Sequence, residues 1–260
     1  MNAIHRVLDP STPTESARGF CALGVMTKAP RAGEVKTRLI PPLTAEEAAA
    51  LNISFLRDTA SAISTAIRKG KAAGKNACGV AVYTPRGAEE AYADILRPHF
   101  VLIPQRGESF GERLLFAAED LFKCGFNSVC LIDSDSPTVR PEIFVQAVQF
   151  LYSPGDRVVL GPSDDGGYYL IGLKKPHREI FERIDWSTER VFDQTRERAR
   201  GTSLEVGLLP KCYDVDDPVA LRRLCNELLG RNSRDEIAPE TCKFLNEIIA
   251  REGRDRIWPA

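Results

Sequence analysis

Four short segments concentrate the residues whose types and spacing could do chemistry, and the first is a basic loop at residues 28–38 (KAPRAGEVKTR). A di- or triphosphate needs cationic side chains and free backbone N–H groups in one concave turn. Lys28, Lys36 and Arg38 could supply the charge, and Gly33 would let the backbone approach closely. A solvated basic loop is equally compatible with the spacing, because neither a complete P-loop nor a GxGxxG motif is present.

The second segment is acidic and follows a strongly apolar run. Asp133 and Asp135 in DSDSP are two residues apart, so both carboxylates can face one hard cation at the end of a strand. Magnesium and manganese prefer such oxygen ligands and share them with substrate phosphates. Helix capping by Asp and Ser is the competing interpretation, and one carboxylate can serve each role.

Two later segments are also rich in acids. Residues 161–169 (GPSDDGGYY) contain an Asp-Gly pair between apolar runs, which is typical of a hairpin turn. A turn explains the glycines but requires neither the paired acids nor the two tyrosines. Residues 213–218 (YDVDDP) carry three acids where a strand meets a helix, more than the single acid that a cap uses.

Bulk properties exclude several classes of protein. The net charge of −1 gives no general attraction to nucleic acid or anionic membranes, and no basic patch is interleaved with aromatics. No apolar run reaches the roughly 20 residues of a membrane span, and the first 18 residues are not a signal peptide. The seven cysteines never form CxxC pairs, which predicts free thiols in a cytoplasmic protein. None of His5, His99 and His177 lies beside a plausible nucleophile, so a hydrolase triad is not supported.

Apolar runs alternate with helical patterns along the chain, which predicts a mostly parallel sheet with helices on both faces. The Pro-, Ser- and Thr-rich residues 1–18 are predicted to be a disordered tail, and residues 19–260 a single domain. Ligands of such sheets bind beyond the carboxyl ends of the strands, where the basic loop and the acidic segments should meet. The predicted strands are 20–26, 79–83, 100–103, 128–132, 157–160 and 168–173, with a short extended piece at 213–215. The predicted helices begin at a Thr44–Glu47 capping box or lie near 89–96, 110–121, 141–151, 188–200, 221–228 and 245–249.

In fixed order, these motifs resemble a bacterial family of uncharacterised, glycosyltransferase-like proteins in the GT-A nucleotide-diphospho-sugar transferase superfamily. The resemblance covers residues 20–220 and includes two further stretches, QRGE at 105–108 with GERL at 111–114, and DWST at 185–188. The family is also similar to 2-phospholactate guanylyltransferase. The resemblance implies an α/β three-layer sandwich with a mostly parallel mixed sheet, and it departs from the family at Ser134, where Gly is common.

The resemblance also implies roles for residues of this chain. It places the triphosphate on the basic loop, with Lys36, Arg38 and Asp135 as catalytic residues. Both Lys36 and Arg38 are expected to contact phosphates rather than a structural carboxylate. The implied nucleotide-binding residues are Lys28, Gly33, Lys36, Thr37, Arg38 and Gln105. The implied acceptor-binding residues are Asp165, Gly166, Gly167, Tyr168 and Trp186, and the implied ligands of Mg²⁺ or Mn²⁺ are Asp133, Asp135 and Asp216.

Three functions remain open at this stage. The basic loop favours metal-dependent nucleotidyl transfer from a nucleoside triphosphate to a small phosphorylated or hydroxylated acceptor. The family resemblance favours glycosyl transfer from a nucleotide-sugar, and a non-catalytic nucleotide-binding protein is the third alternative. The expected partners are therefore a nucleoside triphosphate or nucleotide-sugar and a small-molecule acceptor, without nucleic acid or membrane. The sequence predicts neither the nucleobase nor the oligomeric state.

Overall fold

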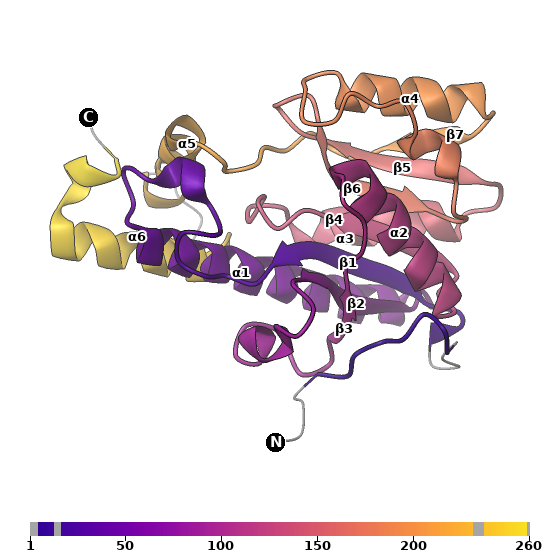
Figure 1. Ribbon diagram of the computed structural model, residues 1–260, viewed down its shortest axis with the longest axis horizontal. Coiled ribbons are helices and arrows are strands. Elements are labelled where there is room, and N and C mark those ends of the chain that lie inside the picture. The colour runs from indigo at the N-terminus through magenta and orange to yellow at the C-terminus, as the bar shows by residue number, and fades with distance from the viewer. Residues whose placement is uncertain (1–4, 13–16, 231–236, 259–260) are drawn as a thin grey trace.

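The computed structural model describes residues 5–12, 17–230 and 237–258, which are built around a central seven-stranded sheet (Figure 1). The strand order is β3-β2-β1-β4-β6-β5-β7, and β6 alone runs antiparallel to its two neighbours. This arrangement confirms the predicted mostly parallel mixed sheet. The strands are β1 Cys21–Lys28, β2 Ala77–Thr84, β3 Val101–Pro104, β4 Ser128–Ile132, β5 Arg157–Pro162, β6 Tyr168–Leu173 and β7 Glu205–Leu208.

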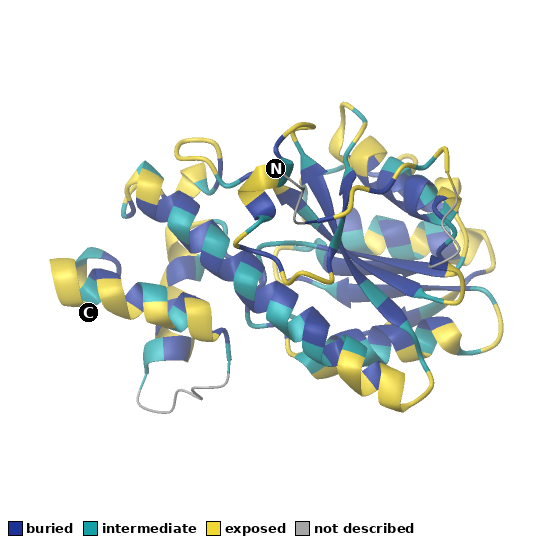
Figure 2. Ribbon diagram, turned by 90° about the horizontal axis from the view of Figure 1, so that it is seen from below, coloured by how far each residue is buried: buried dark blue, intermediate teal, exposed yellow. Residues whose placement is uncertain are grey.

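Helices cover both faces of the sheet and complete the three predicted layers. Helices α1 (Ala45–Ala72) and α3 (Pro141–Tyr152) bury residues such as Ile63 and Phe144 against one face. Helices α2 (Phe110–Lys123) and α4 (Val191–Gly201) bury Leu121 and Ala199 against the other. Figure 2 shows buried residues along the strands and exposed residues on the outer sides of the helices, as expected for strands that lie between two helical layers.

A third apolar cluster joins the C-terminal helices to the first turns of α1. Helices α5 (Pro218–Leu229) and α6 (Pro239–Glu252) lie at one end of the molecule, beside the N-terminal part of α1 (Figure 1). Leu51 and Phe55 of α1 belong to this cluster, together with Leu245 of α6. Four 3₁₀ turns complete the described elements: η2 Thr37–Leu39, η3 Glu89–Tyr92, η4 Arg178–Phe181 and η5 Arg254–Arg256.

The capping box at the start of α1 also anchors the C-terminal segment. Thr44 and Glu47 exchange the two hydrogen bonds of the box, as predicted. The carboxylate of Glu47 also pairs with Arg251 and Arg256, and its side chain is only 11% exposed. Burial opposes ionisation of Glu47, but hydrogen bonds from Arg256 and the Thr44 backbone outweigh it and lower the pKa below its ordinary value.

Because the pKa of Glu47 is lowered on folding, its contribution to stability is present above the unfolded pKa and is lost as the pH falls. We expect Glu47→Gln to lower the free energy of unfolding by about 1.5–3 kcal/mol at pH 7, the usual contribution of hydrogen bonds to a charged group. Urea unfolding at pH 7 and pH 3 measures this effect, which should shrink at the lower pH. Glu46→Gln is the matched control, because Glu46 lies in the same turn and is exposed. Equal losses at both pH values would contradict the ionic role of Glu47.

The N-terminal residues differ from the predicted disordered tail. Val7 forms a β-bridge with Leu102, and the backbone N–H of Leu8 donates to the Leu102 carbonyl at 2.7 Å. The ring nitrogens of His5 lie 3.1 Å from the Phe100 carbonyl oxygen and 3.3 Å from that of Tyr92. The physical reason is that β3 is an edge strand with unpaired backbone groups, which residues 5–12 cover. Residues 1–4 and 13–16 of the predicted tail lie outside the described residues.

One short element was predicted wrongly, because residues 89–96 form only the 3₁₀ turn η3 rather than a helix. The predicted extended piece at 213–215 lies in neither a helix nor a strand. The strand β7 at the other sheet edge was not predicted, because its two end residues are exposed and it has no alternating apolar pattern. All seven cysteines are free, as predicted, and none of the described helices could span a membrane.

Candidate functional site

The candidate site lies at the carboxyl ends of β1 and β4, the two central parallel strands. The chain leaves β1 after Lys28 and leaves β4 after Ile132, so the basic loop and the DSDSP segment start side by side. The sheet order reverses between these strands, because β2 and β3 lie on one side and β6 on the other. Such a reversal point is where open α/β sheets bind ligands.

Lys36 joins three of the four chemically active segments. Its Nζ lies 2.7 Å from Asp135 Oδ1 and 2.8 Å from Asp216 Oδ1, and it donates to the Val215 carbonyl at 2.8 Å. Burial disfavours the charged amine, but the two carboxylates outweigh that effect and raise its pKa. Lys36 is therefore a charged ammonium group with its counter-charges in place.

This pairing corrects the expectation that Lys36 has no structural carboxylate partner, while its contact with phosphates stays a prediction. Its backbone adopts a left-handed conformation with a φ of 49°, and its amine lies 5.3 Å from the centre of the Phe55 ring. Only 4% of the side chain is exposed. A cation that is buried to this extent needs nearby carboxylates, and Asp135 and Asp216 provide them.

The other predicted nucleotide-binding residues of the loop differ in whether they have a partner within the protein. Lys28 pairs with Glu34 of the same loop, with Nζ 3.3 Å from Oε2. Arg38 is exposed and forms no hydrogen bond or ion pair with any residue in the described parts of the chain. Gly33 is exposed with a φ of 75°, a conformation that favours glycine. The loop thus presents one cation, Arg38, that has no partner among the described residues.

Gln105 lies apart from the rest of the predicted nucleotide site. Its amide nitrogen donates to the carbonyls of Thr27 and Val82 at 3.1 and 2.6 Å. Gln105 lines none of the cavities found at this edge of the described structure. Its side chain therefore holds the ends of β1 and β2 together.

The acidic side chains near Lys36 carry more charge than it can balance. The carboxylate of Asp133 accepts a hydrogen bond from Ser136 at 2.8 Å, while burial and then repulsion from Asp135 raise its pKa well above the ordinary value. Asp214 accepts a hydrogen bond from Ser163 at 2.9 Å, and burial followed by repulsion from Asp165 raises its pKa. Raised pKa values of this kind indicate a site that would gain from an additional cation.

The three acids predicted to bind metal are close together but do not form a ready-made site. No group of three Asp, Glu, His or Cys side chains converges on one metal position anywhere in the described residues. Asp135 and Asp216 instead converge on the amine of Lys36. The charged donors of the cluster are carboxylate oxygens, which suit a hard divalent cation.

Three cavities adjoin this cluster, and two of them contain most of the predicted site residues. The smaller, of about 280 Å³, faces the basic loop and is lined by Lys28, Lys36, Thr37 and Ser134 among others. The larger, of about 600 Å³, lies beyond β6 and the start of α4. The residues that line both cavities are Arg38, Asp135 and Asp216.

The larger cavity contains four of the five predicted acceptor-binding residues: Asp165, Gly167, Tyr168 and Trp186. Gly166 is the exception. Its φ is 87°, and a Cβ atom there would lie 2.2 Å from the Glu189 carbonyl oxygen. The Phe192 N–H also donates to the Gly166 carbonyl at 2.8 Å. Gly166 therefore packs the turn against the start of α4 rather than facing the cavity.

Sequence reasoning missed seven residues that line the larger cavity, among them one aromatic and two acidic residues. Phe110 begins the helix that was predicted near 110–121, and it is 53% exposed with its ring centre 5.5 Å from that of Trp186. The signal in the sequence was its position at the start of the helix, because a side chain in the first turn can project past the end of the core. Asp214 could have been found from the excess of acids at 213–218. Nothing in the sequence distinguished Glu189.

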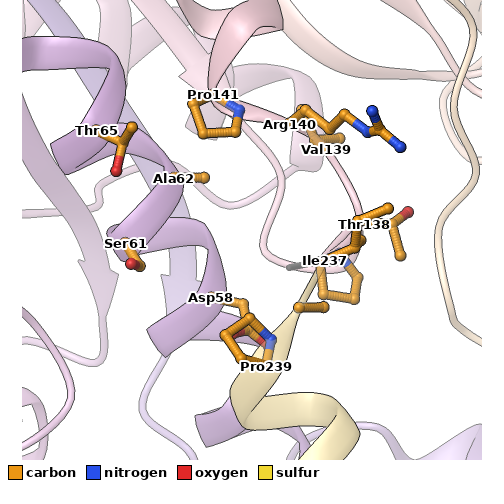
Figure 3. Close-up of a pocket in the computed structure, with 12 residues that line it drawn as sticks. Asp58, Ser61, Ala62, Thr65, Thr138, Val139, Arg140, Pro141, Ile237 and Pro239 are labelled. Carbon is orange, nitrogen blue, oxygen red and sulfur yellow. The ribbon is translucent and has the colours of Figure 1, made fainter. Parts of the chain in front are cut away.

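A separate hollow of about 150 Å³ lies between α1 and the loop before α3 (Figure 3). It shares no lining residue with the cavities at the strand ends. The carboxylate of Asp58, one of its lining residues, accepts hydrogen bonds from the N–H groups of Glu240 and Thr241 at 3.0 and 2.9 Å. Asp58 thus satisfies the first turn of α6, which explains its burial without a ligand.

Comparison with known proteins agrees with this architecture. Residues 69–188 match the family described as "Uncharacterized protein conserved in bacteria (DUF2064)". The crystal structure of a candidate nucleotide-diphospho-sugar transferase from Desulfovibrio desulfuricans G20 is 30% identical, with a TM-score of 0.76, and the match covers 90% of this chain and 97% of that one. No protein with a curated description matches the chain.

More distant structures resemble the chain only weakly. CMP:2-keto-3-deoxy-manno-octonic acid synthetase in complex with CTP is 11% identical, with a TM-score of 0.47 and coverage of 79% of this chain and 96% of that one. Rv0371C from Mycobacterium tuberculosis H37Rv, in complex with manganese, is 16% identical, with a TM-score of 0.42 and coverage of 80% and 98%. At these values neither structure carries an argument about the ligands of this chain.

The fold and the strand-end site define an α/β transferase of the nucleotide-diphospho-sugar transferase type. Within that class, the chain belongs to the nucleotide-diphospho-sugar transferase superfamily, and its residues 69–188 match the DUF2064 family, as the resemblance of its motifs predicted.

Proposed function

We propose that the protein transfers a nucleotidyl group from a nucleoside triphosphate to a small acceptor, with the help of a divalent cation. The observation that carries the proposal is the contact of Lys36 with both Asp135 and Asp216. This contact joins the basic loop to two strand-end acids, which supports one shared site for phosphates and a cation. The two adjoining cavities then offer separate places for a donor and an acceptor.

The donor phosphates fit the smaller cavity. Arg38 has no partner among the described residues and can grip two phosphate oxygens at once, while Lys36 is a point charge beside it. Charge builds on phosphate oxygens during the transfer, and fixed cations stabilise that charge. Asp135 and Asp216, with Asp133 behind them, would hold Mg²⁺ or Mn²⁺ at the wall between the cavities. The cation would supply further neutralisation of phosphate charge when bound.

The acceptor fits the larger cavity. Its hydroxyl oxygen forms a bond to the α-phosphorus, the bond from that phosphorus to the β-phosphate oxygen breaks, and pyrophosphate leaves. The hydroxyl proton must pass to a base. Asp214 lines the cavity, and its carboxylate, which accepts a hydrogen bond from Ser163, is the base that we assign to this proton.

Glycosyl transfer from a nucleotide-sugar is the second candidate. The observation that favours it is the pairing of Lys28 with Glu34 and of Lys36 with two aspartates. Fewer cations are then available for the third phosphate of a triphosphate than the sequence suggested. The two reactions differ in product: pyrophosphate in nucleotidyl transfer, and a nucleoside diphosphate in glycosyl transfer.

Calorimetry with matched nucleotides tests the proposal. We expect each triphosphate that binds in the presence of magnesium to bind at least about tenfold more tightly than its diphosphate, because a charge-assisted contact to the γ-phosphate contributes roughly 1.5–3 kcal/mol. Equal affinities for the triphosphate and the diphosphate, combined with tight binding of a nucleotide-sugar, would replace nucleotidyl transfer by glycosyl transfer. If no nucleotide binds, both proposals fail.

A further inference from the structure

From the charge of the larger cavity we infer that the acceptor is a hydroxyl compound without phosphate or carboxylate groups. The inference rests on the proposed function only in assigning this cavity to the acceptor. It narrows the range of acceptors, because the sequence left phosphorylated and hydroxylated compounds equally open.

Carboxylates dominate the cavity wall. Its six acidic residues are Asp133, Asp135, Asp165, Glu189, Asp214 and Asp216, and Arg38 is the sole basic residue among the described residues that line it. Two like charges 4 Å apart repel by about 1 kcal/mol in water and by more near protein. With the proposed cation held by Asp133, Asp135 and Asp216, the acids of the wall that keep no counter-charge among the described residues are Asp165, Glu189 and Asp214. An anionic group on an acceptor would meet these carboxylates.

The two basic side chains near the cavity, Lys36 and Arg38, are both needed for other contacts. Lys36 faces the smaller cavity and is held by Asp135 and Asp216. Arg38 lines both cavities, and the proposed donor needs it for its own phosphates. A phosphate on the acceptor would therefore compete with the donor for one guanidinium group.

The remaining wall suits hydroxyl groups and the apolar faces between them. Carboxylates accept hydrogen bonds from hydroxyls and, when ionised, donate none. Trp186 and Phe110 pack edge to face, with an angle of 73° between their rings, and form an aromatic side of the cavity. Tyr168 adds a third ring, and burial raises the pKa of its phenol so that the ring is uncharged. The volume of about 600 Å³ lies within the usual range for small-molecule pockets.

Matched pairs of probes that differ only by a phosphate test the inference. We would titrate glucose against glucose 6-phosphate, glycerol against glycerol 3-phosphate, and choline against phosphocholine by calorimetry, with the full chain and magnesium present. The expected result is that at least one unphosphorylated probe binds and that its phosphorylated partner binds at least about tenfold more weakly. The inference is overturned if any phosphorylated probe binds more tightly than its partner, or if none of the three unphosphorylated probes binds.

A charge reversal in the wall provides a second test. Glu189 lines the cavity, is exposed and has no ion pair with any described residue. Glu189→Lys should reduce or reverse the ratio by which the unphosphorylated probe binds more tightly than its phosphorylated partner. Glu182→Lys is the matched control, because Glu182 is an equally exposed acid of the same region that does not line the cavity. An unchanged preference in Glu189→Lys would count against electrostatic selection by the wall.

Triphosphate titrations on the same samples separate the two proposals. If the probes bind as expected but no triphosphate binds, the proposed nucleotidyl transfer fails while the acceptor class stands. If a triphosphate binds tightly but the phosphorylated probes are preferred, the inference about the acceptor fails and the proposed function is retained.

Discussion

Arg38→Ala is expected to lower the rate of transfer by roughly a thousandfold, within the range found for arginines that stabilise transferring phosphoryl groups. Arg38 is exposed, has no partner among the described residues, and lines both cavities at the strand ends. Because it supports no protein contact, its loss should leave the melting temperature of the ligand-free protein unchanged. Steady-state kinetics with the best-binding triphosphate, together with calorimetric unfolding, measures both quantities.

Arg31→Ala is the matched control for this experiment. Arg31 lies on the same loop and is similarly exposed, but it faces Glu34 at 3.9 Å and lines neither cavity. Its replacement should change the rate little. If Arg38→Ala lowers the melting temperature and leaves nucleotide affinity unchanged, Arg38 is structural and the donor site lies elsewhere.

The fold was largely predictable because most of its elements are long and strongly patterned. The five apolar residues of β4 are all buried, and the Thr44–Glu47 capping box marks the start of α1. The segments that were predicted wrongly or missed are all short. The strand β7 has only four residues, half of them exposed, and residues 5–12 are ordered by the edge of β3 rather than by their own sequence. Contacts of this kind depend on the assembled sheet, so no local pattern predicts them.

The convergence of the basic loop and the acidic segments was predictable, but the charge pairing between them was not. The rule that ligands bind beyond the carboxyl ends of strands brought together segments that are 180 residues apart. It did not predict that the side chain of Lys36 would turn inward, because that depends on a left-handed backbone conformation and on burial against Phe55. A lysine on a polar loop has the same local sequence whether it faces solvent or a buried carboxylate.

The same pairing gives the second large effect, on cation binding without nucleotide. In the wild-type protein the amine of Lys36 already holds Asp135 and Asp216. A unit positive charge about 4 Å from a divalent cation costs about 2–8 kcal/mol, depending on the effective dielectric constant. A divalent cation should therefore bind weakly until nucleotide phosphates draw Lys36 away from the carboxylates.

We accordingly expect Lys36→Met to bind Mn²⁺ alone at least about tenfold more tightly than the wild-type protein, while transfer falls by roughly a thousandfold. Without metal, the variant should unfold at a lower temperature than the wild-type protein, because Asp135 and Asp216 lose their counter-charge. A hundredfold excess of Mn²⁺ over its dissociation constant should then raise the free energy of unfolding of the variant by about 2.7 kcal/mol. Calorimetry of Mn²⁺ binding and thermal unfolding with and without Mn²⁺ measure these changes.

Lys28→Met removes the same charge from the same loop, but its amine is paired with Glu34, so it should not tighten Mn²⁺ binding in this way. Equal Mn²⁺ affinities in the wild-type and Lys36→Met proteins would mean that Lys36 and the cation do not compete, and that Asp135 and Asp216 serve the lysine alone.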